Sequence, residues 1–352
     1  MHVLIVKRGA LGDVVRTSYF AEALKRKHAG KIRISWITAP AATSLIRFNP
    51  HIDDLWTFFD QARSYRFDRI WSLDDEVDAL EGVACLDAKR VSGAYLDPCG
   101  KSVYSGDVAA WFDMGLLSRF GKKKADALKK KNQCTHGEIF SKIFEVDSPV
   151  PRFYGERRIE ADARLWLGDD AWHLGINPFA GGRWPSKELP LAELKTLLRH
   201  LLLCMHGLQR PLDVVLLGAG RDRVRNQDMA DDIGDPRIRV ADTDESPLHL
   251  GAVVRGLNCL ITSDSLAMHL AASQGIPFIA FFAPTSAAEI DDFGIGVKLS
   301  STASDYCSYR KNTDNSSITA ERLAAVLAPI LQLPAPSKLR STALLNSKSS
   351  FL

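Results

Sequence analysis

Short runs of hydrophobic residues recur along the chain, and polar or turn-forming residues bound each of them. Such runs are typical of strands that are buried on both faces of a parallel sheet. Hydrophobic residues at helical spacing separate several of these runs, so strands and helices alternate, which predicts an α/β protein with doubly wound sheets. The predicted strands lie at residues 3–6, 33–38, 54–59, 69–73, 90–93, 172–178, 212–217, 237–240, 257–262 and 277–283.

A change of composition near the middle of the chain predicts a domain boundary. Residues 111–144 are charged and helical in propensity, and two prolines between Ser148 and Pro151 favour a linker. We therefore expect an N-terminal domain over residues 1–155 and a C-terminal domain over residues 156–317.

The last part of the chain has two different characters. Residues 318–333 show the spacing of an amphipathic helix, for which Thr319 can serve as the N-cap. Residues 334–352 are rich in serine, lysine and proline and predict a mobile polar tail.

The first predicted strand leads into a basic turn and then into Asp13, which is placed at or near the start of a helix. Gly9 and Gly12 allow the backbone to turn tightly there. Asp13 can simply cap the helix, as aspartate does in many proteins. It also follows a strand at the edge where open α/β sheets usually bind ligands, and Lys7 and Arg8 can influence its charge.

A second turn of this kind begins at Asp264, between two hydrophobic runs. Ser265 would open a helix whose first backbone N–H groups can bind a phosphate. We expect Asp264, Ser265 and His269 to cluster at the carboxyl end of a strand.

Together these two turns resemble glycosyltransferase family 9, the lipopolysaccharide heptosyltransferase type. Leu189 stands where the family usually has tryptophan, and Leu266 stands where it generally has glycine. The family's opening motif is similar to residues 3–14, its lysine motif to 184–190 and its donor-binding motif to 264–272, with a weaker match at 214–220 and Asp222.

The resemblance implies a GT-B fold, in which two Rossmann-like domains face a central cleft. The first domain would bind the acceptor and the second the nucleotide sugar, and the helix at 318–333 would return to the N-terminal domain. The implied reaction is the inverting, metal-independent transfer of a sugar to a hydroxyl of a glycan or lipopolysaccharide-core acceptor. The expected sugar is a heptose, with ADP-heptose as the donor. No cofactor is implied.

The resemblance also assigns roles to individual residues. Asp13 would be the catalytic base, and Lys187 would neutralise the departing diphosphate. Asp264 would orient His269 or bind sugar hydroxyls, and Asp222 is equally well explained as a helix cap. The expected donor-binding residues are Gly12, Arg183, Gly218, Asp222, Asp264, Ser265, Leu266 and His269.

Composition and charge narrow the classes of partner. A net charge of +3 on 352 residues is too small to argue for nucleic acid. No apolar run is long enough to span a membrane, and the N-terminus lacks the apolar core of a signal peptide. Six scattered cysteines without a Cys-x-x-Cys pair predict free thiols in a reducing cytoplasm rather than a zinc site or disulfides.

Two charged segments leave alternatives open. The basic run at residues 122–131 is either a solvated helix face or an electrostatic contact with an anionic acceptor or the inner face of the cytoplasmic membrane. Residues Asp74 to Glu76 lack the spacing of metal ligands and predict a solvated loop.

Other classes of function compete with the transferase. The turn from Gly9 to Gly12 lacks the G-x-G-x-x-G spacing of dinucleotide-binding enzymes. A nucleotide-sugar hydrolase or epimerase, and a non-catalytic nucleotide-sugar-binding protein, remain as alternatives to glycosyl transfer.

Overall fold

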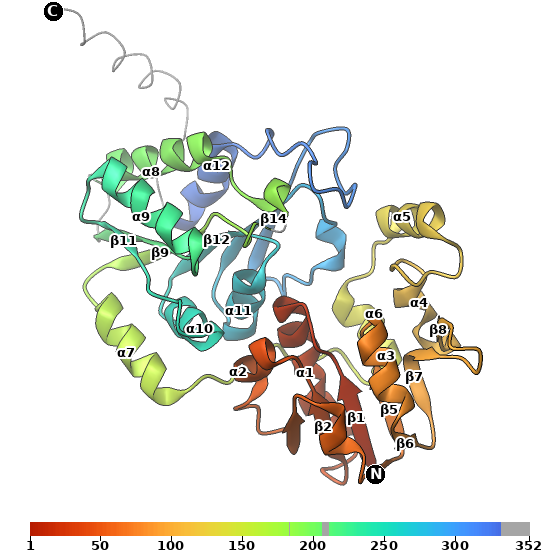
Figure 1. Cartoon of the computed structure of the whole chain (residues 1–352). Helices are drawn as coiled ribbons and strands as arrows, with labels where there is room; N and C mark the ends of the chain where they lie inside the picture. Colours follow the sequence, from red (N-terminus) through yellow and green to blue (C-terminus); the bar gives the residue numbers. More distant parts are fainter. Residues whose placement is uncertain (183, 206–210, 332–352) are drawn as a thin grey trace, which may run out of the picture. The chain divides into compact units, whose positions relative to one another are not determined.

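The computed structural model describes residues 1–182, 184–205 and 211–331, and these form two compact units (Figure 1). Unit 1 contains Met1–Arg157 and Ala288–Asp291, and unit 2 contains Arg158–Ala287 and the chain from Asp292 onward. Each unit has its own six-stranded sheet with helices around it, so the expectation of two doubly wound α/β domains is confirmed. The expected polar tail at 334–352 lies outside the described residues.

The sheet of unit 1 has the order β3-β2-β1-β5-β7-β8. All neighbouring strands are parallel except β7 and β8, which pair antiparallel. A separate parallel pair of two-residue strands lies beside it. The main strands are β1 (His2–Val6), β2 (Arg33–Ile37), β3 (Asp54–Trp56), β5 (Arg69–Ser72), β7 (Val91–Leu96) and β8 (Ser102–Tyr104), and the short pair is β4 (Arg66–Phe67) and β6 (Asp87–Ala88).

Aromatic side chains hold helices against this sheet. The Phe20 ring of α1 stacks on Phe144 of α6 at 4.9 Å, and Trp71 of β5 meets the same ring edge-on at 4.9 Å. The helices of unit 1 are α1 (Leu11–Lys27), α2 (Thr43–Ile46), α3 (Val77–Ala84), α4 (Ala109–Phe112), α5 (Lys122–Lys131) and α6 (His136–Phe144), with short 3₁₀ turns at Pro40–Ala42, Phe59–Ala62 and Gly106–Val108.

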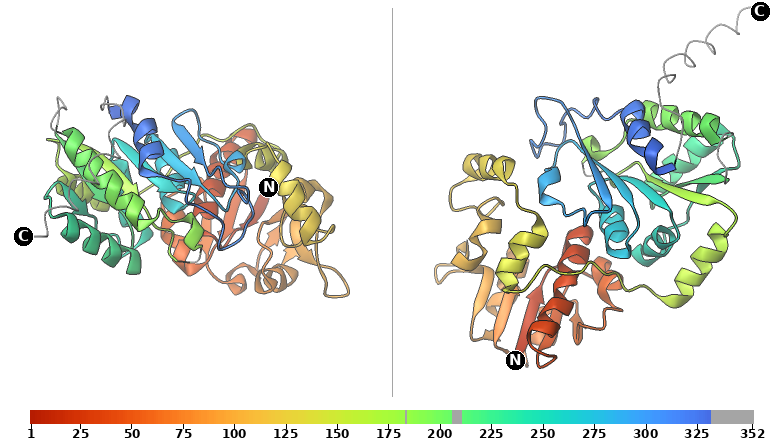
Figure 2. Two further views of the ribbon diagram at one scale, coloured as in Figure 1. Left: turned by 90° about the horizontal axis from the view of Figure 1, so that it is seen from above. Right: turned by 180° about the vertical axis from the view of Figure 1, so that it is seen from behind.

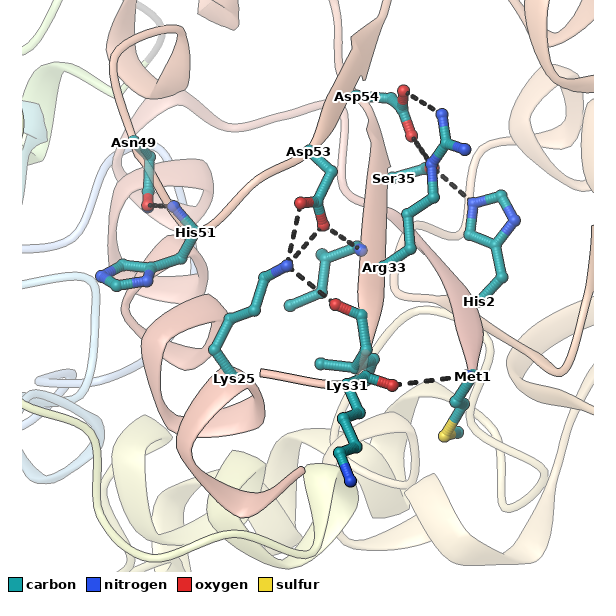
Figure 3. A network of polar contacts seen from close by, with 12 residues as sticks. Met1, His2, Lys25, Lys31, Arg33, Ser35, Asn49, His51, Asp53 and Asp54 are labelled. Atoms are coloured by element: carbon teal, nitrogen blue, oxygen red, sulfur yellow. Dashed lines mark hydrogen bonds and ion pairs between the residues drawn. The ribbon is translucent and has the colours of Figure 1, made fainter. Parts of the chain in front are cut away.

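A polar network ties the first three strands of unit 1 together (Figure 3). Lys25 Nζ donates to both carboxylate oxygens of Asp53, at 2.9 and 2.6 Å. The Arg33 guanidinium makes two bonds to Asp54, at 2.8 and 2.7 Å, and Ser35 Oγ donates to the same carboxylate. This network links β2 to the end of α1 and to β3 at the amino ends of these parallel strands, the end opposite to the turn that follows β1.

The sheet of unit 2 is entirely parallel and has the order β11-β10-β9-β12-β13-β14. Hydrophobic residues from α8, α9 and α12 pack with one face of this sheet, and α10 packs against α11 (Figures 1 and 2). The strands are β9 (Trp172–Asn177), β10 (Leu212–Leu216), β11 (Ile238–Val240), β12 (Cys259–Ser263), β13 (Phe278–Phe282) and β14 (Gly296–Ser300). The helices are α7 (Arg157–Leu167), α8 (Leu191–Met205), α9 (Arg221–Ile233), α10 (Pro247–Arg255), α11 (Leu266–Gln274) and α12 (Ala320–Leu331), with a 3₁₀ turn at Pro185–Lys187. A further 3₁₀ turn, Ala287–Glu289, lies where the chain passes from unit 2 to the short segment of unit 1.

Helix α12 belongs to the hydrophobic core of unit 2. Leu323 and Leu327 are buried there, and α12 packs on α8 and β13. The resemblance had implied that this helix returns to the N-terminal domain. Instead, its apolar face packs in the hydrophobic core of unit 2. Thr319 is its N-cap as predicted, because the Arg322 backbone N–H donates to Thr319 Oγ1 at 3.3 Å.

Within the described residues, no helix is long and apolar enough to cross a membrane. The structure describes all six cysteines, and none of them forms a disulfide.

Candidate functional site

The turn after β1 differs in one detail from the sequence interpretation. Helix α1 begins at Leu11 with Ala10 as its N-cap, and the Val14 N–H bonds the Ala10 carbonyl at 3.0 Å. Asp13 is therefore the third helical residue rather than the cap, and Gly12 is the second. A carboxylate in this first turn is still favoured by the positive end of the helix dipole.

Two cations flank the carboxylate of Asp13. Arg16 Nη2 lies 2.7 Å from Asp13 Oδ1, and Lys7 Nζ lies 3.9 Å from Asp13 Oδ2. The Arg8 guanidinium instead pairs with Asp78 at 2.5 Å. Arg16 was missed in the sequence, although its spacing of three residues on a helix is a recognisable signal for such a pair.

Asp74 anchors this turn from the neighbouring strand β5. Its side chain is buried, accepts from Lys7 Nζ at 2.7 Å and accepts from the Arg8 backbone N–H. Burial alone would lower the pKa of Lys7, but the charges of Asp74 and then Asp13 outweigh it and raise that pKa. The prediction of a solvated acidic loop was therefore wrong for Asp74, because β5 is the neighbour of β1 and brings Asp74 to the basic turn.

In unit 2, Lys187 lies on the 3₁₀ turn Pro185–Lys187 and reaches the start of α11. Its ammonium donates to Asp264 Oδ2 at 2.8 Å and to the Asp264 carbonyl at 3.1 Å. Burial would raise the pKa of Asp264, but the positive charges of Lys187 and then His269 lower it well below its usual range. Asp264 therefore presents a full negative charge that orients the Lys187 side chain.

Ser265 is the N-cap of α11, but its hydroxyl is turned toward the neighbouring strands. Asn177 Nδ2 donates to Ser265 Oγ at 3.0 Å, and Thr262 Oγ1 lies 3.0 Å from the same oxygen. The Ser265 side chain does not cap the first N–H groups of α11. Leu266 is the first residue of α11. The position at which the resembled family generally has glycine therefore lies at the start of this helix.

His269 is buried on the second turn of α11, four residues after Ser265. It lies close enough to Asp264 for its positive charge to lower the pKa of that carboxyl. His269 and Lys187 thus act on the same carboxylate, one from within α11 and the other from the loop after β9.

Asp222 holds the glycine loop that precedes Lys187. It is buried in the first turn of α9, and its Oδ2 accepts from the Gly181 N–H at 2.8 Å. Gly181 and Gly182 have φ values of +70° and +74°, a conformation that favours glycine. Arg183, the next expected site residue, lies outside the described residues.

Gly218 allows the close packing of the turn after β10. A Cβ at this position would lie 3.0 Å from both Asn226 Nδ2 and Asp222 Cβ. The glycine therefore lets the first turns of α9 approach the strand end, and Asp222 reaches Gly181 from that position.

Arg225 is a further anchor of the same loop that the sequence did not single out. Its guanidinium pairs with Glu188 at 2.9 Å, and its central carbon lies 3.5 Å from the centroid of the Phe179 ring. Phe179 and Glu188 belong to the segment around Lys187, so α9 fixes both ends of that segment.

Both candidate sites lie where strand order reverses. In unit 2, β10 and β11 lie on one side of β9, and the chain then crosses to β12 on the other side. Asn177 is the last residue of β9, and Ser265 follows β12. In unit 1, Lys7 and Asp74 follow β1 and β5 in the same manner. Such reversal points are the usual ligand-binding positions of open α/β sheets.

The described residues contain no group of three or more His, Cys, Asp or Glu side chains placed to hold a metal ion. Unit 2 brings together the Lys187 cation, side-chain hydroxyls and the backbone N–H groups at the start of α11, which suit a phosphate-containing ligand.

Comparisons with solved structures identify the architecture. A glycosyl transferase of family 9 from Veillonella parvula is 18% identical, with a TM-score of 0.73 over 94% of this chain and 97% of that one. The ADP-heptose lipopolysaccharide heptosyltransferase II of E. coli is 14% identical, with a TM-score of 0.68 over 94% of this chain and 99% of that one. The chain has the GT-B fold.

A third similar structure is E. coli heptosyltransferase WaaC with ADP, which is 16% identical, with a TM-score of 0.61 over 94% of this chain and 100% of that one. No protein-family model and no curated protein matches the sequence. At these identities the likeness establishes the GT-B fold, and the chemistry has to be argued from the residues.

Proposed function

We propose that this protein is an inverting glycosyltransferase of family 9 that uses a nucleotide diphosphate sugar, with ADP-heptose as the preferred candidate donor. The observation that carries the proposal is the Lys187–Asp264 pair beside Ser265 at the strand reversal of unit 2. One cation, one hydroxyl and the backbone N–H groups at the start of α11 together suit a diphosphate. The motif resemblance and the ADP in a similar heptosyltransferase structure support this choice of donor.

In the proposed reaction the acceptor hydroxyl oxygen bonds to the anomeric carbon while the bond from that carbon to the diphosphate oxygen breaks. The hydroxyl proton passes to Asp13, and the negative charge that develops on the diphosphate is stabilised by Lys187 and the N-terminus of α11. The acceptor is a hydroxyl of a glycan or of the lipopolysaccharide core.

In unit 2, one group of residues is proposed to contact the donor, and a second group is proposed to hold the first group in place. Lys187, Ser265 and the α11 N–H groups would contact the diphosphate, with His269 and Asp264 near the sugar. Asp222, Gly218 and Arg225 would hold the loop that carries Lys187. We assign these three residues to positioning, because Asp222 binds the Gly181 N–H and Arg225 pairs with Glu188 on either side of Lys187.

The proposal is tested with a panel of ADP-, UDP-, GDP- and CDP-sugars, first by calorimetry and then by incubation with phosphorylated lipopolysaccharide-core acceptors. We expect binding of an ADP sugar and a mass increase of the acceptor by one sugar residue. Release of free sugar without any modified acceptor would indicate a hydrolase. Tight binding with neither product would indicate a binding protein.

A further inference from the structure

Helix α5 and the segment before it concentrate the positive charge of the chain. Residues 113–131 contain seven Lys or Arg and two Asp, which gives a net charge of +5, whereas the whole chain carries +3. The remainder of the protein is therefore slightly negative. The charge of this segment is a local property and not a consequence of a basic protein.

Most of these basic side chains face solvent. In the ten residues of α5, only Ala125 is fully buried, and five of the six lysines are exposed. Figure 1 shows α5 joined to α4 and α6 by loops, away from the strands of the unit 1 sheet. The exposed lysines are Lys122, Lys123, Lys124, Lys130 and Lys131.

Large apolar side chains are exposed in the segment that directly precedes these lysines in the chain. Leu116 is 88% exposed and Phe120 is 50% exposed. The Phe120 ring centroid lies 5.1 Å from the central guanidinium carbon of Arg119 and 6.0 Å from Lys124 Nζ. An aromatic ring therefore lies within the basic cluster. A helix face that is merely solvated explains the lysines but not these exposed apolar groups.

We propose that this region, the α5 surface (Leu116, Arg119, Phe120, Lys122–Lys124, Lys130 and Lys131), docks on the surface of an anionic lipid bilayer. Lysines attract anionic headgroups, while leucine and phenylalanine gain free energy by entering the boundary between headgroups and acyl chains. A soluble polyanion would use the lysines but would gain nothing from Leu116 and Phe120. The combination of the two kinds of side chain selects the bilayer.

The test is flotation of the full chain with phosphatidylcholine vesicles that contain either no or about 30% phosphatidylglycerol. A lysine near an anionic surface contributes about fivefold to partitioning. We expect Lys123→Ala/Lys130→Ala/Lys131→Ala to weaken binding to the anionic vesicles by about 100-fold. The matched control is Lys31→Ala/Arg66→Ala/Lys89→Ala, which removes the same charge from exposed positions elsewhere in unit 1. Equal losses in both triple variants would overturn the proposal.

A second pair of variants separates a bilayer from a soluble anion. We expect Leu116→Ala/Phe120→Ala to weaken vesicle binding by about tenfold. Phe58→Ala/Val77→Ala, which truncates two other exposed apolar residues of unit 1, should leave it unchanged. Unchanged binding in the first pair, together with full displacement from vesicles by inositol hexakisphosphate, would identify a soluble polyanion site and overturn bilayer docking. These measurements need no glycosyl donor, so their outcome is independent of the proposed reaction.

Discussion

Lys187 donates twice to Asp264, once to the carboxylate at 2.8 Å and once to the backbone carbonyl at 3.1 Å. An ammonium group has three N–H donors, so this arrangement leaves one for a further acceptor. The pair also keeps the long lysine side chain in a single orientation at the start of α11. Asp264 is therefore a positioning residue for Lys187, and a bound diphosphate would meet an ordered cation.

Replacing Lys187 by alanine should weaken ADP binding. Loss of a charge-assisted contact of this kind costs about 1.5–3 kcal/mol, or roughly a 10- to 150-fold increase in Kd by calorimetry. Lys187→Arg should fall between wild type and alanine, because the charge is kept while its shape changes. Lys195→Ala, on α8 of the same unit, is the control. Equal ADP affinity in all variants would remove Lys187 from the diphosphate site.

Replacing Asp264 by asparagine should destabilise unit 2 with a characteristic pH dependence. The folded pKa of Asp264 is depressed below its unfolded value, so its stabilising effect is complete above about pH 4 and is lost as the pH falls through the folded pKa. Chemical unfolding should show a deficit of about 1.5–3 kcal/mol, constant from pH 5 to 8. The deficit should narrow only below about pH 4. A deficit that varies between pH 5 and 8 would contradict this assignment.

Asp13→Asn should abolish most turnover without affecting donor binding. A positioned base contributes about 10²–10⁴-fold to the rate, and asparagine cannot accept the proton. Its nearly equal shape should preserve helix α1, which circular dichroism checks. The acidic limb of the pH–rate profile should disappear with the carboxylate. Asp60→Asn, which removes an exposed carboxylate of unit 1, is the control. Near-normal transfer by Asp13→Asn would limit Asp13 to pairing with Arg16.

Asp222→Ala should loosen the glycine loop in front of Lys187. Without the acceptor for its N–H, the Gly181 amide should exchange with solvent about tenfold faster or more, as measured by NMR hydrogen exchange. ADP affinity should fall as well, because Lys187 is carried by the same loop. Asp228→Ala removes an exposed acid of the same helix and should change neither quantity. Faster exchange in both variants would point to a general weakening of α9.

Gly93→Ala should strongly destabilise unit 1. Gly93 lies on β7 with a φ of +121°, and a Cβ there would lie 1.9 Å from the Ser72 carbonyl oxygen of β5. Forcing these strands apart should cost at least about 3 kcal/mol in urea unfolding. Gly106→Ala is the matched control, because it has open space and an ordinary φ. A stable Gly93→Ala protein would mean that β5 and β7 can separate at little cost.

The sequence by itself determined most of the strands and the residues that follow them. Strands buried on both faces must be hydrophobic without interruption, so β1, β9 and β12 are visible as short apolar runs. Two edge strands, β8 and β14, were missed because their residues are only partly buried and carry no such run. The Thr319 cap was predictable for a similar reason, since it depends on residues three positions apart.

Only the tertiary structure decided which of these turns meet. Lys7 and Asp74 are 67 residues apart in the chain, and Lys187 and Asp264 are 77 apart. Each pair forms because the strands that precede or support its members are neighbours in a sheet, and strand order is set by long-range packing and not by local pattern. The sequence thus named Asp13, Lys187 and Ser265, while the fold supplied their partners and gave Asp222 its contact with the Lys187 loop.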